Sequence, residues 1–237
     1  MIKNFKNRQA HRCYLEDHQA CTLRSRHHGF YLDVGANNGI FKSKTIALED
    51  AGWKGICIEA NPIIFEDLKI NRGHRNTLCV NECLVSEAHS GKEVEFYVGD
   101  ASGVSCGIIP DDSFIYKEKF RWKSGDRNIK IKGKSLRQTL DENRCPKRIE
   151  YAKFDIEGAE TEILSDFSFD KYCFLFLVIE LANDVIVNKL YDNGYFYIGA
   201  QGEDGSPPSD DFFIHRTNPF AKTYVERAFE NRDTKGY

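Results

Sequence analysis

The sequence lacks the features that direct a chain to a membrane or to a polyanion. Its longest apolar run, residues 173–179, is far too short to cross a bilayer, which takes about 20 residues. Residues 1–8 lack the apolar core of a signal peptide. Acidic and basic residues nearly balance, to a formal net charge of -3, so no global positive field attracts nucleic acid or anionic lipid. We therefore expect no membrane partner and a cytoplasmic location.

Patterns that join cysteines to a metal or to one another are also missing. The chain has eight cysteines but no C-x-x-C pair. Cys79 and Cys83 are four residues apart, yet they lie in a predicted strand without a matching cluster of histidine or cysteine, which disfavours a zinc site. Cysteines in core strands behave as small buried hydrophobic residues. Free thiols are therefore expected.

What the sequence does contain is an alternation of strand and helix patterns. Hydrophobic residues make up 41% of the 237 residues, and we expect one domain over residues 1–237. The patterns predict strands at 30–34, 55–59, 77–84, 93–98, 150–155, 173–180, 195–199 and 211–215, and helices at 40–51, 62–72, 135–143, 158–165 and 182–192. This alternation predicts an α/β fold with a mainly parallel sheet and helices on both faces. Residues 1–29 are interpreted as helical cover, and residues 218–237 as a C-terminal helix and tail.

One segment, residues 99–134, interrupts the alternation. Aromatic side chains alternate with lysine and arginine from 114 to 123, and Ile129 and Ile131 alternate with lysines beyond a turn at 124–126. This pattern predicts an inserted β-hairpin with one apolar and one basic face. The basic face is either a solvated outer surface or a lip that grips an anionic substrate, such as an acidic glycan or nucleic acid.

The most informative stretch is the end of the first predicted strand and the loop after it. Asp33 lies near the end of this apolar strand, and Gly35 and Gly39 allow a tight turn beside a ligand. The next strand ends in Glu59, where a doubly wound sheet presents a carboxylate to ribose hydroxyls. The glycine spacing departs from G-x-G-x-x-G, and Asp33 would repel a pyrophosphate but suit the amino group and sulfonium of S-adenosylmethionine (SAM). We therefore predict SAM, and not NAD, as the cofactor.

Four separated blocks of the sequence resemble the FkbM-type methyltransferases of the class I, Rossmann-like, SAM-dependent group. The blocks are LDVGANNG at 32–39, GWKGICIEANP at 52–62, NECLVS at 81–86 and YAKFDIEGAE at 151–160. The resemblance implies a Rossmann-like seven-stranded sheet whose last strand is antiparallel. It also implies SAM-dependent O-methylation of a hydroxyl group, often on a sugar or a secondary metabolite.

The predicted cofactor site gathers residues at and after the first three strands. Asp33 and the backbone of Gly35, Ala36, Asn37 and Gly39 are assigned to the methionine moiety, Glu59 with Ala60 and Asn61 to the ribose, and Cys83 and Leu84 to the adenine edge. For Cys83 and Leu84, ordinary core packing explains the residues equally well.

Three carboxylates are predicted to border the acceptor: Asp155, Glu157 and Glu180. Methyl transfer requires the acceptor oxygen to be aligned with the methyl carbon and to lose its proton. Asp155 or Glu180 is the candidate base or orienting group, and Glu157 supports the site. Alternatively Glu157, like Glu160, only begins the next helix, where a carboxylate favours the helix dipole. Such acids can also hold Mg²⁺, but without a metal signature we predict no metal.

Three functions are compatible with these features. The leading one is a SAM-dependent O-methyltransferase with a small-molecule or glycan acceptor, which the loop at 201–210 could cover. The second is a methyltransferase that acts on nucleic acid through the basic hairpin. The third is a SAM-binding domain without catalytic activity, because one fold hosts many functions.

Overall fold

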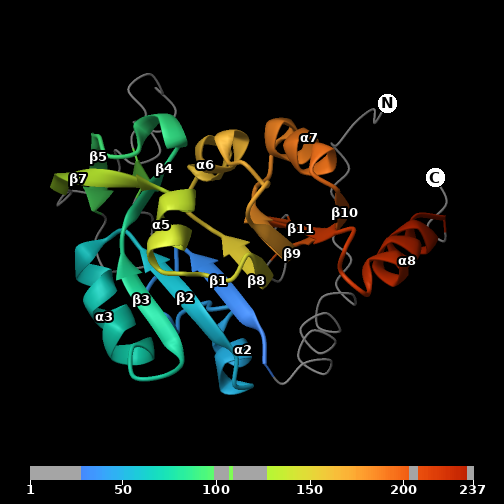
Figure 1. Ribbon diagram of the computed structural model, residues 1–237, viewed down its shortest axis with the longest axis horizontal. Helices are drawn as coiled ribbons and strands as arrows, with labels where there is room; N and C mark the ends of the chain where they lie inside the picture. The colour runs from blue at the N-terminus through green and yellow to red at the C-terminus, as the bar shows by residue number, and fades with distance from the viewer. Residues whose placement is uncertain (1–27, 99–106, 109–126, 203–207, 234–237) are drawn as a thin grey trace.

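The computed structural model describes residues 28–98, 107–108, 127–202 and 208–233 (Figure 1). At its centre is a seven-stranded sheet of order β10-β11-β9-β8-β1-β2-β3. Its strands are β1 (Phe30–Val34), β2 (Lys54–Glu59), β3 (Thr77–Asn81), β8 (Arg148–Phe154), β9 (Cys173–Glu180), β10 (Tyr195–Gln201) and β11 (Asp210–His215). Among these seven, six strands run in the same direction and β11 alone runs in the opposite one. The predicted α/β sheet with an antiparallel last strand is thus confirmed.

The strand order reverses between β1 and β8, which are parallel hydrogen-bonded neighbours although they lie far apart in sequence. From β1 the chain moves outward through β2 and β3, and it later builds the other half of the sheet from β8 and β9. At such a reversal the connections diverge and leave a crevice at the carboxyl ends of the strands. The topology therefore places a ligand site beyond the ends of β1, β2, β8 and β9.

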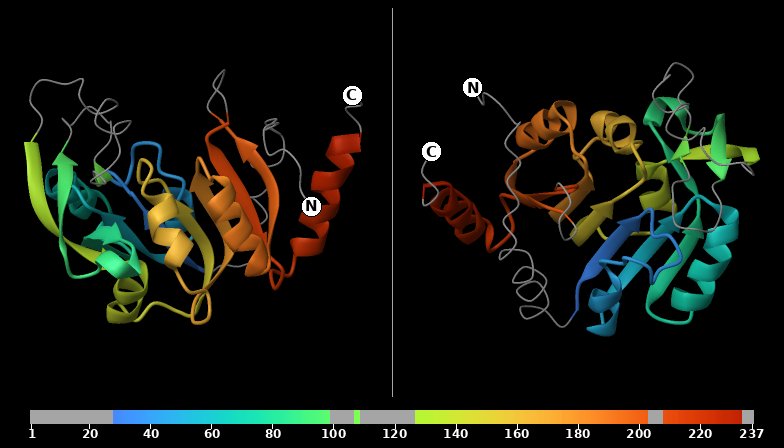
Figure 2. Two further views of the ribbon diagram at one scale, coloured as in Figure 1. Left: turned by 90° about the horizontal axis from the view of Figure 1, so that it is seen from above. Right: turned by 180° about the vertical axis from the view of Figure 1, so that it is seen from behind.

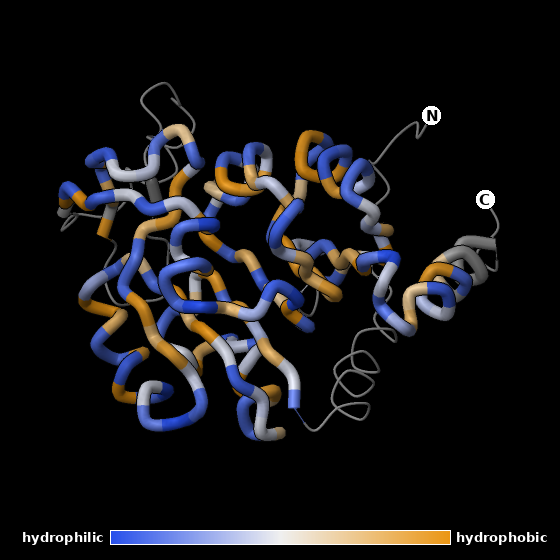
Figure 3. The backbone as a smooth tube through the Cα atoms, viewed as in Figure 1, coloured by the Kyte–Doolittle hydropathy of each residue, from blue (hydrophilic) through white to orange (hydrophobic). Residues whose placement is uncertain are grey.

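Helices cover both faces of this sheet (Figure 2). One face carries α5 (Leu136–Glu142), α6 (Glu160–Asp166) and α7 (Asp184–Asp192), and the other carries α2 (Ile46–Asp50), α3 (Pro62–Arg72) and α8 (Ala221–Asp233). Hydrophobic residues concentrate in the strands between the two layers (Figure 3). In β9, for example, residues 174–179 are all buried, as expected for a strand covered on both faces.

A second sheet, of four strands, has the order β4-β7-β5-β6. It consists of β4 (Cys83–Val85), β5 (Glu93–Val98), β6 (Gly107–Ile108) and β7 (Arg127–Ser135), and a short 3-10 helix (Glu87–His89) follows β4. The second half of the predicted hairpin, residues 129–132, lies in β7 and pairs with β5. Residues 114–123 are outside the described residues, so their pairing stays a prediction.

The single strand predicted at 77–84 is wrong, because the chain leaves the central sheet after Asn81 and Cys83 begins β4 in the second sheet. The side-chain amide of Asn81 donates to two backbone carbonyls at the end of β2, at 2.8 and 3.1 Å. Glu82 then accepts from Lys134 Nζ at 2.6 Å. These partners are distant in sequence. The apolar pattern of residues 77–84 therefore shows no interruption at the point where tertiary contacts end the strand.

The helix predicted at 40–51 is also wrong in its start, because α2 begins only at Ile46. Asn38 Oδ1 accepts hydrogen bonds from the backbone amides two and three residues later, at 3.0 and 2.8 Å. Ser43 Oγ accepts from the amide of Ile46 at 3.2 Å. Side chains that capture nearby amides in this way compete with the helix. Residues 35–45 therefore form turns over the carboxyl edge of the sheet.

Other predictions concern the ends of the chain and its cysteines. Residues 1–27 and 234–237 lie outside the described residues, whereas α8 matches the helix expected after residue 218. No helix in the described part of the chain combines the length and the apolar character that a membrane span needs. The cysteines described as free thiols are Cys57, Cys79, Cys83, Cys145 and Cys173, as expected.

Candidate active site

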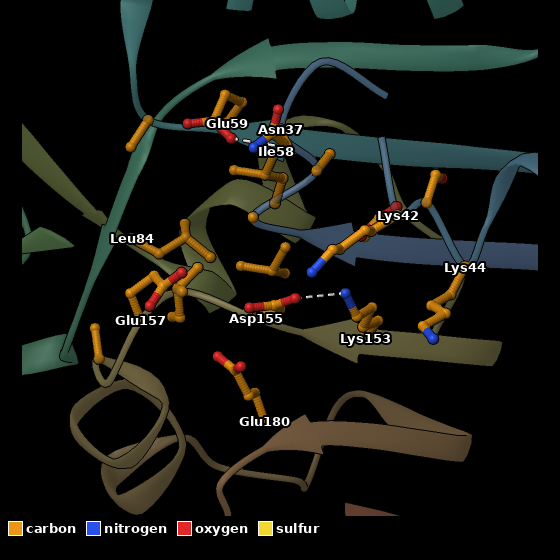
Figure 4. A pocket seen from close by; sticks show the side chains of 18 of the residues that line it. Asn37, Lys42, Lys44, Ile58, Glu59, Leu84, Lys153, Asp155, Glu157 and Glu180 are labelled. Carbon is orange, nitrogen blue, oxygen red and sulfur yellow. Dashed lines mark hydrogen bonds and ion pairs between the residues drawn. The ribbon is translucent and has the colours of Figure 1, made fainter. Parts of the chain in front are cut away.

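A cavity of about 620 Å³ opens at the carboxyl edge of the central sheet (Figure 4). Its volume is in the range of cofactor and small-molecule sites. The predicted site residues that line it are Asp33, Gly35, Ala36, Asn37, Glu59, Ala60, Cys83, Leu84, Asp155, Glu157 and Glu180. Gly39 and Asn61 do not line it. Both ends of the predicted loop at 201–210 do, through Gln201, Gly202, Ser209 and Asp210, while residues 203–207 lie outside the described residues.

Two glycines let the loop after β1 pack closely against the protein. Gly35 has a φ of 80°, and a Cβ atom there would lie 1.8 Å from the carbonyl oxygen of Asp155. Gly39 has a φ of 79° and faces α3, where a Cβ atom would lie 2.6 Å from Cγ of Arg72. Gly35 thus allows the loop to run along the cavity wall, while Gly39 anchors it from behind.

Asp33 lines the cavity but is only 2% exposed. Its Oδ2 accepts a hydrogen bond from Thr45 Oγ1 at 2.6 Å, which ties the strand to the far end of the loop. Burial raises the pKa of Asp33, and Lys153 on the neighbouring strand opposes this rise. Asp33 therefore shapes the loop and places a carboxyl group beside the cavity. Its contact with a methionine moiety stays a prediction.

Glu59 is held by backbone amides on both of its oxygens. Its Oε2 accepts from the amide of Asn37 at 2.9 Å and its Oε1 from the amide of Asn61 at 2.8 Å. The side chain is 8% exposed, and this burial raises its pKa to about 7 against the effect of the hydrogen bonds. A carboxylate has about four acceptor positions, so acceptor capacity is left for ribose hydroxyls. Asn61, behind the wall, also caps α3 by accepting from the amide of Ile63 at 2.9 Å.

The predicted adenine wall lies where the two sheets meet. Cys83 and Leu84 line the cavity together with Phe96 of β5. Burial raises the pKa of the Cys83 thiol to about 12, so the sulfur is a neutral, apolar surface. Cys83 also packs with Val85 and Phe96 in the core of the second sheet. The same residues thus contribute to core packing and form an apolar wall that suits the adenine ring.

The three predicted catalytic carboxylates converge from separate elements. Asp155 follows β8, Glu157 lies in the next loop and Glu180 ends β9, yet oxygen atoms of all three lie within 4.8 Å of one another. Burial and the negative charge of Asp155 raise the pKa of Glu180 to about 9. Burial also acts to raise the pKa of Asp155, but Lys153 and Glu180 together hold it below its ordinary value. Within this cluster, Asp155 is therefore ionised and Glu180 protonated near neutral pH.

Lys153 is a site residue that the sequence reasoning missed. It is 6% exposed, lines the cavity, and places Nζ 2.6 Å from Oδ2 of Asp155. Figure 4 shows Asp155 between Lys153 and Glu180. A lysine between the buried residues Ala152 and Phe154 was the available signal, because a charge in a core strand requires a partner.

Glu160 has a larger role than the helix-dipole effect expected from sequence. Its Oε1 accepts a hydrogen bond from the amide of Ile156 at 2.6 Å, and the side chain is buried. Burial raises its pKa to about 7. Between these two residues Glu157 has a positive φ of 58°, which few residues other than glycine adopt. Glu160 therefore holds the strained turn that presents Glu157 to the cavity.

Among the described residues, Asp155, Glu157 and Glu180 lie close enough together to form a possible metal site. Its spacing alone is compatible with a divalent cation. However, the ammonium group of Lys153 already forms an ion pair with Asp155 in this cluster. We therefore assign no metal ligands, and the absence of a metal stays a prediction from the sequence.

Comparison with known proteins relates these elements to one family. Residues 33–197 match the family model described as a methyltransferase FkbM domain, which includes all of the predicted cofactor and catalytic residues. Among solved structures, the chain matches the crystal structure of a precorrin-6y C5,15-methyltransferase from Geobacter metallireducens GS-15. That match has 14% sequence identity, covers 85% of this chain and 88% of that chain, and has a TM-score of 0.43. No curated protein matches the chain.

Proposed function

Because the chain belongs to the FkbM methyltransferase family, we propose that it methylates a hydroxyl group of a sugar, a glycan or another small metabolite. Family membership makes the chain a methyltransferase and implies SAM as the methyl donor. The observation that carries the finer proposal is Asp155, a carboxylate held ionised beside Lys153 on the wall of a cofactor-sized cavity. A base in this position is what a hydroxyl acceptor requires.

The chemistry of the step explains this requirement. Bound SAM supplies a methyl group on a sulfonium, and S-adenosylhomocysteine leaves. The acceptor oxygen forms the new bond to carbon with its own electron pair, and sulfur keeps the pair of the bond that breaks. The hydroxyl proton passes to Asp155, so charge and atoms balance. The remaining task of the protein is to align the oxygen with the methyl carbon.

The residues around the cavity fit a cationic donor. Asp33 and Asp155 place carboxylates on its wall, which favours an amino group and a sulfonium over a pyrophosphate. Glu59 retains acceptor capacity for ribose hydroxyls beside its hydrogen bonds to backbone amides. Cys83 and Leu84 supply an apolar wall for the adenine ring of SAM. For location we propose the cytoplasm, supported by the free cysteines, since thiols persist in reducing compartments.

A nucleic-acid acceptor has less support in the described residues. Lys130 and Lys132, from the predicted basic face, stand directly opposite Glu95 and Glu93 of β5. Cross-strand pairs of opposite charge offset each other. The part of the basic pattern that lies in β7 is therefore balanced locally, which supports the interpretation as a solvated outer face.

The donor assignment is tested by isothermal titration with SAM and, separately, with NAD. We expect micromolar binding of SAM and none of NAD. Glu59→Ala should weaken SAM binding roughly 10-fold or more, because it removes an acceptor of charge-assisted hydrogen bonds. Glu66→Ala, on the exposed side of α3, is the matched control and should bind SAM as the wild type does.

The acceptor class is tested next with methyl-labelled SAM and a panel of sugars, glycans and other hydroxyl compounds. Transfer to a hydroxyl oxygen, identified by mass spectrometry of the product, is the expected result. Failure of SAM to bind would contradict the donor assignment. Tight binding of SAM without transfer to any hydroxyl compound would instead favour a non-catalytic SAM-binding domain.

A further inference from the structure

Lys153 occupies a position that connects the two ends of the cavity. It lies two residues before Asp155 in chain order, so both side chains leave the chain on the same side. In the neighbouring strand its register partner is Asp33, which points to that same face. The ammonium group is thus set between a carboxylate at the cofactor end and a carboxylate at the acceptor end, and it forms its short contact with Asp155.

We propose that Lys153 is a positioning residue that keeps Asp155 as the ionised member of the Asp155–Glu180 pair, so that Asp155 accepts the substrate proton and Glu180 keeps its own. This assignment rests on the proposed O-methyl transfer. It separates two carboxyl groups that the sequence left as equal candidates for the base.

The argument is one of charge balance within a confined space. Oxygen atoms of Asp155, Glu157 and Glu180 lie within 4.8 Å of one another, and like charges at that distance do not all ionise in a partly buried site. The 2.6 Å ion pair with Lys153 favours the charged form at Asp155. Glu180 then carries the proton and can donate it as a hydrogen bond to Asp155.

Other charged groups act on Lys153 or on the pair from the neighbouring elements. Asp33 on β1 and Asp210 at the start of β11 act on Lys153. Lys42 in the loop after β1 acts on Asp155, and Glu157 in the turn after β8 and Glu160 at the start of α6 act on Glu180. Glu157 and Glu160 raise the pKa of Glu180, whereas Lys42 acts with Lys153 to lower the pKa of Asp155. The two cations thus act on the same member, which strengthens the difference between Asp155 and Glu180.

The pH profile of methyl transfer tests this role directly. In Lys153→Met, the pKa of Asp155 should rise because its cation is gone. The acidic limb of kcat against pH should then move upward by roughly one unit or more, with activity recovering at high pH. Lys153→Arg, which retains the charge, should restore the wild-type limb. A lower plateau with an unmoved acidic limb would overturn the proposal and leave Lys153 with a purely structural role.

A matched control is the pair Lys171–Asp141, whose contact is also 2.6 Å but lies away from the cavity. Lys171→Met should leave the acidic limb in place. If both methionine variants moved the limb equally, the shift would reflect general charge removal, and the assignment to Lys153 would fail.

A second measurement needs neither donor nor acceptor. Carbon-13 NMR titration of the wild-type carboxyl groups, assigned with Asp155→Asn and Glu180→Gln, should show Asp155 titrating below and Glu180 well above its ordinary range. The reverse order, or one shared titration in both groups, would contradict the proposal. If the protein transferred no methyl group, the proposed function would fail, while the same titration in Lys153→Arg and Lys153→Met would still decide whether Lys153 keeps Asp155 ionised. The same titration replaces the kinetic test if Lys153→Met does not fold.

Discussion

Two charge clusters, one buried and one half-buried at the cavity, use similar residues in opposite ways. The first, here the α3 cluster, centres on Arg72, whose side chain is fully buried and is paired with Glu49 of α2. Arg72 also donates to the carbonyl of Gly39 at 2.9 Å and to the hydroxyl of Tyr31 at 2.8 Å. Thr77 of β3 donates to the same Glu49. The α3 cluster thus matches anion with cation and joins four elements and the loop after β1.

The second, here the cavity cluster, consists of Lys153, Asp155, Glu157 and Glu180. Its acids outnumber its cation, and each lines the cavity instead of the core. The mismatch appears as a raised pKa at Glu180, due to burial and to Asp155. Breaking a matched buried pair destabilises a fold strongly, whereas mismatched acids persist where catalysis uses their shifted protonation. In this molecule, the balance of charge, and not burial alone, therefore distinguishes a cluster that stabilises the fold from a cluster suited to catalysis.

The largest effect we expect is on stability, from Arg72→Met in the α3 cluster. The change leaves Glu49 as a buried charge without its main partner, which should lower the free energy of unfolding by about 3–5 kcal/mol. Urea unfolding followed by circular dichroism measures it. Lys222→Met, which removes an exposed ion pair on α8, should change this quantity by less than about 0.5 kcal/mol. Equal effects of the two variants would remove the structural role from the α3 cluster.

The next effect is on catalysis, from Asp155→Asn in the cavity cluster. Loss of the base should lower kcat at least about 100-fold, while the affinity for SAM, measured by titration, changes little. Unfolding free energy should stay near the wild-type value, because the substitution relieves repulsion among the acids as it loses the contact with Lys153. Normal turnover by this variant would show that Asp155 is not the base. The cavity cluster would then lose the catalytic role that distinguishes it from the α3 cluster.

The smallest effect concerns the pH dependence of stability through Glu180. Its pKa is about 9 in the folded protein against an ordinary value of 4.5, so only the folded state holds this proton between these values. The contribution of Glu180 to stability is therefore complete below pH 4.5 and is lost as pH rises through 9. Since the side chain is partly open to the cavity, we expect the loss between pH 5 and 9 to be on the order of 1 kcal/mol.

Glu180→Gln should flatten this part of the stability curve, as thermal unfolding across the pH range would show. The control Glu226→Gln alters an exposed carboxylate and should leave the curve unchanged. A wild-type curve that rises from pH 5 to 9 relative to Glu180→Gln would contradict the raised pKa.

Much of the candidate site could be predicted because its signals are local. The placement of Glu59 and Asp155 at strand ends followed from apolar runs that stop at a carboxylate. The need for Gly35 followed from the turn it occupies, although its closest contact, the carbonyl of Asp155, lies far along the chain. Lys153 was missed because a lysine in an apolar strand indicates that it has a partner, but the sequence does not show that this partner is Asp155 on the cavity wall.

The errors have the same physical origin. The strand predicted at 77–84 is broken by hydrogen bonds from Asn81 to the end of β2, and the helix predicted from residue 40 is shortened by side chains that capture amides. Glu160 does begin α6 as expected, but its further hydrogen bond to the amide of Ile156 depends on a turn with positive φ and was not predicted. Periodicity reports burial along a segment, and it does not report competing polar contacts.

The sequence by itself determined the α/β alternation, the family of the chain and the carboxylates available to its cavity, since these depend on periodicity and on short motifs. Only the tertiary structure decided how those carboxylates divide their protons. That division depends on distances between β1, β8 and β9, on the burial of each acid and on the position of Lys153 among them. Because the free energy of ionisation varies with the distance to other charges and to water, no local pattern in the chain specifies it.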